Sequence, residues 1–125
     1  MTNAESTQKI TIASARGGAS NYRSINLLAT GLVVKATPGN LYSINAHNLN
    51  AAVRYLKVYD KATAATEADT PKFTIALPPG AMPPVTFPAG AFFANGICIR
   101  ATTELADNGT TAPTASETIV NLTYK

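Results

Sequence analysis

The sequence has one cysteine, one histidine and no tryptophan among its 125 residues. A single cysteine, Cys98, excludes an intrachain disulfide. A single histidine, His47, is the one imidazole base available to a nucleophile, and no Gly-x-Ser-x-Gly motif accompanies it. We therefore predict no catalytic residues, a surface or interface role for His47, and a half-buried thiol at Cys98, since no basic cluster adjoins it in sequence to activate it.

Charged residues are also scarce, at 14% of the chain against about 25% in a typical domain. A surface left to Ala, Thr, Asn, Pro and Ser is easier to desolvate against another protein, and interface cores are depleted in charge. The formal net charge is +3, but the ten Lys and Arg residues are scattered, whereas nucleic-acid-binding proteins gather them on one stripe. We therefore predict a protein partner, and no nucleic acid.

The carboxylates are few and dispersed, which argues against a metal site. Glu67 and Asp69 lie close in sequence, as do Glu104 and Asp107, but neither pair has the spaced oxygen ligands of a dedicated Ca²⁺ site. The segment 16–18 (Arg-Gly-Gly) lacks the lysine and the strand–loop–helix context of a phosphate loop. We predict no metal and no cofactor.

Long apolar runs are missing as well. No stretch approaches the roughly 20 apolar residues of a membrane span, and residues 1–9 are polar, without an apolar signal core. We therefore expect a protein made in a cytoplasm and no membrane partner.

What the sequence does contain is a succession of short alternating segments between turn signals rich in Pro, Gly and Asn. No segment has a convincing 3.6-residue apolar stripe. The pattern predicts an all-β fold, an antiparallel β-sandwich of jelly-roll or Ig-like type with about seven strands, over residues 27–125. The expected strands are 31–37, 41–48, 52–60, 72–77, 85–87, 97–103 and 117–125.

Residues 1–26 differ in composition, being rich in Ser, Thr, Ala, Asn and Gly. Residues 9–13 (Lys-Ile-Thr-Ile-Ala) alternate like a strand, and residues 16–20 then interrupt any regular element. Two interpretations stay open. The segment is an extended or partly ordered N-terminal arm that a partner orders, or it is an ordinary edge strand and loop of the same domain.

Two adjacent aromatic residues, Phe92 and Phe93, lie near the proline-rich part of the chain. Adjacent strand residues point to opposite faces, so one ring would enter the core while the other would serve as a contact anchor; the alternative buries both rings at a strand bend. The residues that we assign to a protein interface are Arg16, Tyr22, Arg23, Phe92 and Phe93.

Several sequence segments that combine a strand with a turn resemble the small β-sandwich virion structural proteins of tailed bacteriophages, of the capsid decoration or cement type. The resemblance extends over most of residues 32–125, leaves out the N-terminal segment, and includes no catalytic motif. The segments are Leu32–Tyr42, Ala52–Ala62, Ile75–Gly80, Phe87–Gly90 and Val120–Lys125.

This resemblance implies a non-catalytic protein that decorates and stabilises a phage capsid by binding the lattice of major capsid protein. It implies a homotrimer or other homo-oligomer located on the capsid surface of the virion. The alternative is a tail, fibre or head-accessory module for host-surface attachment or connection. A third class, a small lyase or hydrolase, lacks the residues that it would need.

Overall fold

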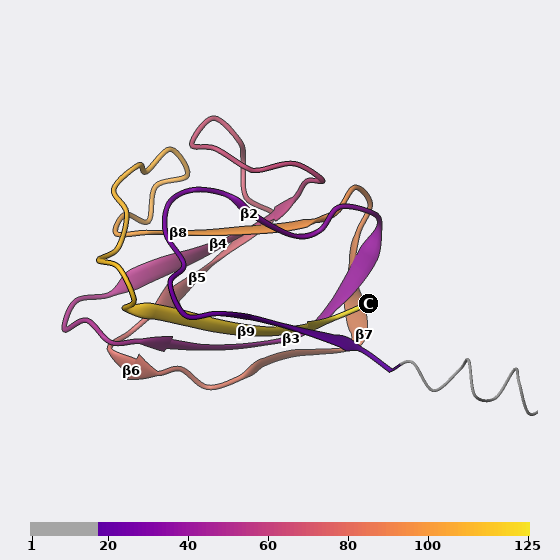
Figure 1. The fold of residues 1–125 in the computed structure, drawn as a ribbon, viewed down its shortest axis with the longest axis horizontal. Coiled ribbons are helices and arrows are strands. Elements are labelled where there is room, and N and C mark those ends of the chain that lie inside the picture. Colours follow the sequence, from indigo (N-terminus) through magenta and orange to yellow (C-terminus); the bar gives the residue numbers. More distant parts are fainter. Residues whose placement is uncertain (1–17) are drawn as a thin grey trace, which may run out of the picture.

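The structure is a computed structural model that describes residues 18–125, and these residues form nine β-strands and no helix (Figure 1). Within this range there is accordingly no helix that could cross a membrane. The strands are β1 (Ser20–Ser24), β2 (Leu32–Lys35), β3 (Gly39–Asn48), β4 (Arg54–Asp60), β5 (Phe73–Leu77), β6 (Gly80–Ala81), β7 (Val85–Phe93), β8 (Ile97–Thr102) and β9 (Thr118–Tyr124).

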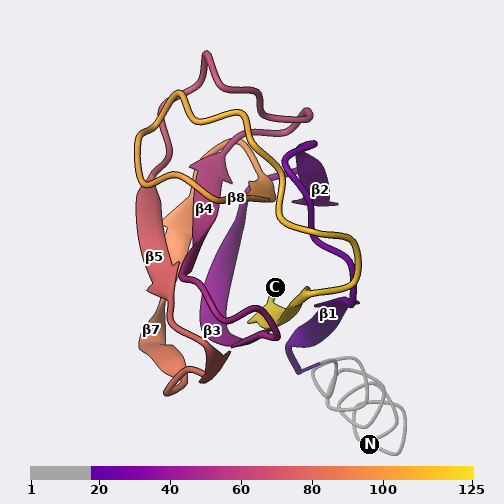
Figure 2. The ribbon, with the colours of Figure 1, turned by 90° about the vertical axis from the view of Figure 1, so that its left-hand side faces the viewer.

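The strands form two antiparallel sheets that pack face to face, so the predicted all-β sandwich is confirmed. Sheet A has the order β1-β9-β3-β6, with β7 also paired to β3, and sheet B has the order β2-β8-β4-β5. Figure 2 shows β1 and β2 at one side of the sandwich and β5 and β7 at the other.

The core lies between the two sheets and follows the period-two alternation of the strands. On β8, Ile97 and Ile99 face the core together while Cys98 points away. The fully buried apolar side chains of the core include Leu41, Ile44, Ala46, Leu56, Val58, Phe93, Ile97, Ile99, Ala101 and Val120.

The strand β7 is longer than the predicted strand 85–87, because it continues through Pro88–Gly90 as far as Phe93. Its pairing with β3 shifts register there: Ala91 lies opposite Leu41, but Thr86 lies opposite Ser43. The residues between them bulge out of the ladder, which is where a strand tolerates proline. Gly90 has a φ of 84°, a backbone conformation that glycine adopts without steric cost.

The sandwich also begins earlier than predicted. Strand β1 pairs along its whole length with β9, from Ser20 opposite Tyr124 to Ser24 opposite Val120. Residues 20–24 are therefore part of sheet A, and the predicted boundary at residue 26 lies too late in the chain. The remainder of the predicted arm, residues 1–17, lies outside the described residues.

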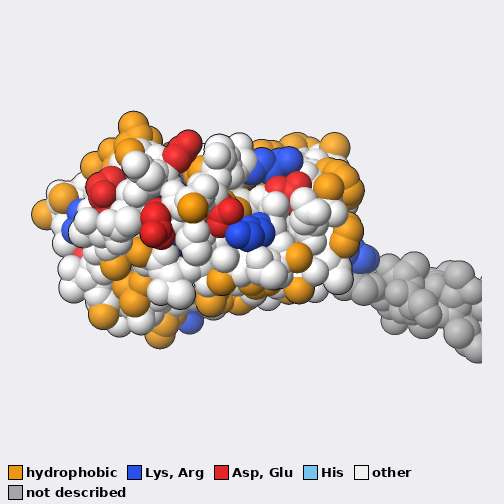
Figure 3. Space-filling view, turned by 90° about the horizontal axis from the view of Figure 1, so that it is seen from above, with side chains coloured by type: hydrophobic (Ala, Val, Ile, Leu, Met, Phe, Trp, Pro, Cys, Tyr) orange, Lys and Arg blue, Asp and Glu red, His pale blue; other side chains and the backbone are white. Residues whose placement is uncertain are grey.

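Two long connections, residues 61–72 and 103–117, fold over the outer face of sheet B, and we call them the loop cap. They lie at the top of Figure 1, and Figure 3 looks down on them, with acidic and basic side chains spread over the surface. Beneath the cap, Tyr59, Ala65 and Cys98 form a second small core. Sheet B is thus covered on both faces, which explains why all six residues of β8 are buried.

Candidate interaction face

The outer face of sheet A is a row of polar side chains contributed by neighbouring strands. Val120 and Leu122 are buried in the core, so Asn121 between them points outward. The strand register places Asn45 of β3 on one side of Asn121 and Arg23 of β1 on the other. We define the interaction face by the outward residues Asn21, Arg23, Asn40, Ser43, Asn45, Phe92, Asn121 and Thr123.

Phe92 is the large apolar side chain of this face. It lies opposite Asn40 in the β3–β7 ladder, and 60% of its surface is exposed. Its neighbour Phe93 is fully buried, because alternation turns it into the core. The first interpretation of this pair is therefore correct: the ring of Phe93 enters the core and the ring of Phe92 faces outward. The assignment of Phe93 to a protein interface is wrong.

The other predicted interface residues also differ in whether their side chains face solvent or the core. Arg23 is exposed, while Tyr22 is half-buried and packs against the core, because it lies opposite the buried Leu122. Burial raises the pKa of Tyr22, and the neighbouring Tyr124 raises it further. The structure therefore places Arg23 and Phe92 on one face, at its two sides. Arg16 lies outside the described residues.

The interaction face is polar but poor in charge. None of the strands of sheet A contains an Asp or Glu residue. The hydroxyl groups of Ser43 and Thr123 hydrogen-bond to each other across β3 and β9, and a shallow groove of about 350 Å³ runs between Arg23, Asn45 and Asn121. By contrast, the loop cap on the opposite side carries Glu67, Asp69, Glu104 and Asp107.

His47 and Cys98, the residues considered for chemistry, lie apart. His47 is half-buried on the outer side of β3, between Ile119 and Ala81 of the neighbouring strands. Cys98 is fully buried, more so than predicted, and its Sγ accepts a hydrogen bond of 3.4 Å from the backbone N–H of Ala65. Burial raises the pKa of this thiol, so the neutral form is favoured.

The carboxylates are engaged in holding loops. The carboxylate of Asp60 accepts hydrogen bonds from the backbone N–H groups of Ala94 and Asn95, at 3.1 and 2.8 Å. The carboxylate of Glu104 accepts a hydrogen bond of 2.7 Å from the backbone N–H of Thr111. Asp69 forms an ion pair of 2.7 Å with Lys61. Within residues 18–125, no three His, Cys, Asp or Glu residues come together as a metal-binding group.

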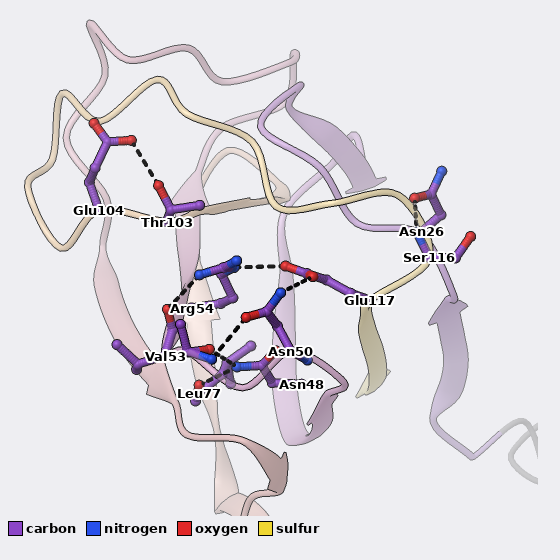
Figure 4. Close-up of polar contacts among 11 residues, drawn as sticks. Asn26, Asn48, Asn50, Val53, Arg54, Leu77, Thr103, Glu104, Ser116 and Glu117 are labelled. Carbon is purple, nitrogen blue, oxygen red and sulfur yellow. Dashed lines mark hydrogen bonds and ion pairs between the residues drawn. The ribbon is translucent and has the colours of Figure 1, made fainter.

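A buried polar cluster joins the two sheets at one end of the sandwich (Figure 4). Arg54 Nε and Asn50 Nδ2 both donate to the carboxylate of Glu117, at 2.7 and 2.8 Å. Asn48 Nδ2 donates to the carbonyl oxygens of Ala52 and Leu77, at 2.8 and 2.9 Å. These contacts fix the β3–β4 connection against the start of β9.

The Glu117 contacts predict a dependence of stability on pH. Burial acts to raise the pKa of Glu117, but hydrogen bonds from Arg54 and Asn50 outweigh it, and the pKa lies below its ordinary value of 4.5. The unfolded chain therefore takes up the proton first, so this stabilisation is present above about pH 4.5 and is lost as the pH falls through the folded-state pKa. We expect Glu117→Gln to cost roughly 1–3 kcal/mol of unfolding free energy at pH 7.

The measurement is urea unfolding of the wild-type and Glu117→Gln chains between pH 7 and pH 3. The two stabilities should converge as the pH falls. Asp107→Asn, which removes an exposed carboxylate of the loop cap, is the control and should not change the pH dependence appreciably. Parallel curves for wild type and Glu117→Gln would contradict the assignment.

Comparison of the chain with protein-family models, with curated proteins and with solved structures gave no match.

Proposed function

We propose that this chain is a non-catalytic structural protein of a phage virion, which decorates and stabilises the capsid by binding the lattice of major capsid protein through the interaction face. The observation that carries the proposal is the carboxylate-free outer face of sheet A, with Arg23 at one side and the exposed ring of Phe92 at the other. The resemblance of the strand-and-turn segments to capsid decoration proteins is the basis for proposing the major capsid protein as the partner.

The chemistry of the interaction face suits a protein surface. Amide and hydroxyl groups such as those of Asn45, Asn121 and Thr123 hydrogen-bond to either donors or acceptors, and their desolvation costs much less than that of charges. Phe92 supplies an apolar anchor, and aromatic and Arg side chains dominate interface energetics. Arg23 would pair with an acidic group of the partner.

The proposed geometry leaves the loop cap facing outward. Its carboxylates stay hydrated there, while Asp69 and Glu104 hold its backbone in place. A face of this type would bury about 800 Å² per partner. Repetition of the contact in a homo-oligomer on a symmetric lattice would make individually weak contacts collectively strong.

The test of position is cryo-electron microscopy of a native particle that contains the chain. We expect hundreds of copies spread over an icosahedral shell, with the outer face of sheet A turned toward the capsid protein. A few copies at a vertex or on the tail would replace this proposal with the attachment or connector function. Absence of the chain from particles would remove the virion function.

A matched set of variants tests the face itself. Phe92→Ser should weaken binding to isolated shells by about tenfold or more, because contact anchors of this type contribute about 2 kcal/mol or more. The control is Leu105→Ser, which removes an apolar side chain of similar exposure, 62%, from the loop cap. Binding is measured by co-sedimentation at several protein concentrations, and equal losses for the two variants would contradict the assigned face.

A further inference from the structure

A buried arginine lies beneath the loop cap, on the outer side of β8. Arg100 is 1% exposed, and each of its three nitrogens donates to a neutral acceptor. Nε donates to the carbonyl of Ala29 at 2.8 Å, Nη1 to the hydroxyl of Tyr59 at 3.1 Å, and Nη2 to the carbonyl of Gly109 at 2.9 Å. A guanidinium has five N–H groups, so these three bonds leave two N–H groups for another acceptor.

The positive charge of Arg100 has no anionic partner among residues 18–125, where the ion pairs are Arg54–Glu117 and Lys61–Asp69. A second buried cation lies beside it. Lys57 is directly opposite Arg100 in the β4–β8 ladder, is fully buried, and donates to the carbonyl of Ala106. The carboxylates of Asp107 and Glu104 act on Lys57, so the charge left without compensation is that of Arg100. Buried charges in proteins are usually paired, and an anion beside Arg100 would supply the missing partner.

Arg100 also forms part of the wall of a hollow of about 320 Å³. The other walls come from the β1–β2 connection (residues 29–31), the first loop of the cap (residues 64–67), and Thr110 of the second loop. Thr30, Thr66 and Thr110 are among the wall residues; the hydroxyl of Thr66 hydrogen-bonds to Asp69 and Ala68 of its own loop, which leaves Thr30 and Thr110 as hydroxyl donors. A volume of this size corresponds to about ten molecules of liquid water, so a small polyatomic ion fits with some of its hydration.

We propose that this hollow binds a small oxyanion, whose oxygen atoms accept hydrogen bonds from the two remaining N–H groups of Arg100 and from the hydroxyls of Thr30 and Thr110. The ligand compensates the charge of Arg100 and joins the three segments that meet there. Oxyanions of two shapes share this chemistry, the tetrahedral phosphate type and the planar carboxylate type. The experiment separates them.

The probes are inorganic phosphate and acetate, each titrated at constant ionic strength into the isotopically labelled full chain, with amide chemical shifts recorded by NMR. We expect saturable shifts at residues 29–31, 64–67 and 110. A response to phosphate alone establishes a tetrahedral oxyanion site, and a response to acetate alone establishes a carboxylate site. Absence of saturable shifts with both probes overturns the proposal.

Two variants of the second cap loop supply a matched comparison. Thr110→Glu places a carboxylate on the wall of the hollow. This carboxylate should accept hydrogen bonds from the free N–H groups of Arg100 and so reduce the affinity for the probe at least tenfold. Thr114→Glu adds the same charge at an exposed residue of the same loop that is not part of the wall, and should change the affinity by less than threefold. Equal affinities for these two variants would overturn the proposal.

A residue at the rim of the hollow allows an independent test, in which the affinity for the anionic probe is expected to rise. Glu67 is exposed and contributes to the wall, so its negative charge opposes an entering anion. Glu67→Gln should tighten binding of the probe about threefold, the effect of one unit charge about 6 Å away in water. Weaker binding in this variant would contradict an anion as the ligand.

Discussion

Replacing Phe93 with alanine should lower the free energy of unfolding by about 3–5 kcal/mol, the range for removing a large aromatic side chain from a well-packed core. The ring is fully buried, lies 6.4 Å from the ring of Phe73 in an edge arrangement, and has the Lys72 ammonium 5.1 Å from its centre. Its cross-strand partner is Gly39, which has no side chain to fill the space. The cavity would therefore persist.

The adjacent residue supplies the control for this prediction. Phe92→Ala removes the same ring from the same strand, but from a position that is 60% exposed, and should change stability by less than about 0.5 kcal/mol. Both values come from urea unfolding followed by circular dichroism. Similar losses for the two variants would mean that the inward and outward assignments of this pair are incorrect.

Replacing Arg100 with methionine should destabilise the protein by about 3–4 kcal/mol. The substitution leaves the carbonyls of Ala29 and Gly109 and the hydroxyl of Tyr59 without their donors, and each buried unsatisfied group costs about 1–3 kcal/mol. Removing a buried charge recovers part of that cost, so the net loss is below the sum. The loop cap should also become susceptible to proteolysis between residues 103 and 117, because Arg100 holds that loop at Gly109.

Arg23→Met is the matched control for Arg100→Met, since it makes the same chemical change at an exposed residue of β1. It should leave the unfolding free energy within about 0.5 kcal/mol of wild type. Buried ionic groups can sometimes be replaced by apolar residues without loss. An Arg100→Met protein as stable as the Arg23→Met protein, with an equally protected loop cap, would therefore refute the role of Arg100 in joining the loops.

The strands that face the core were predictable from the sequence because one local rule decides them. In 97–103 and 117–125, apolar residues recur at every second position, and the structure buries Ile97, Ile99, Val120 and Leu122. The bulge of β7 was not predictable in this way. Proline and glycine at 88–90 indicate a turn, and only the pairing of both flanking segments with β3 makes them one strand.

The burial of Lys57 and Arg100 could not be predicted from their own strands. Alternation places both on the face away from the core, where charged residues are normally exposed. Their burial depends on loops 61–72 and 103–117 closing over sheet B, which is a long-range effect. Strand β1 was missed for a related reason, since Tyr22 is its one apolar contact with the core and its pairing partner lies at the far end of the sequence.

The interaction face was predictable in part from the sequence. The contrast between Phe92 and Phe93 follows from alternation, and a polar side of β3 is visible in its sequence. That Arg23 and Phe92 share a face follows from the strand order β1-β9-β3 with β7 on β3, because that order places residues from both ends of the chain on one sheet. No local pattern contains this information.

The position of β9 has a consequence for how the chain reaches its native state. This last strand lies between β1 and β3, so β1 has no pairing partner in the sheet until residues 118–124 have been synthesised, and β3 is paired until then on the side of β6 and β7 alone. Sheet A therefore cannot be completed, and β1 cannot join it, before the end of β9 has left the ribosome. Sheets closed by such distant segments fold slowly, and the edges of β1 and β3 that pair with β9 stay open to other chains until this strand inserts.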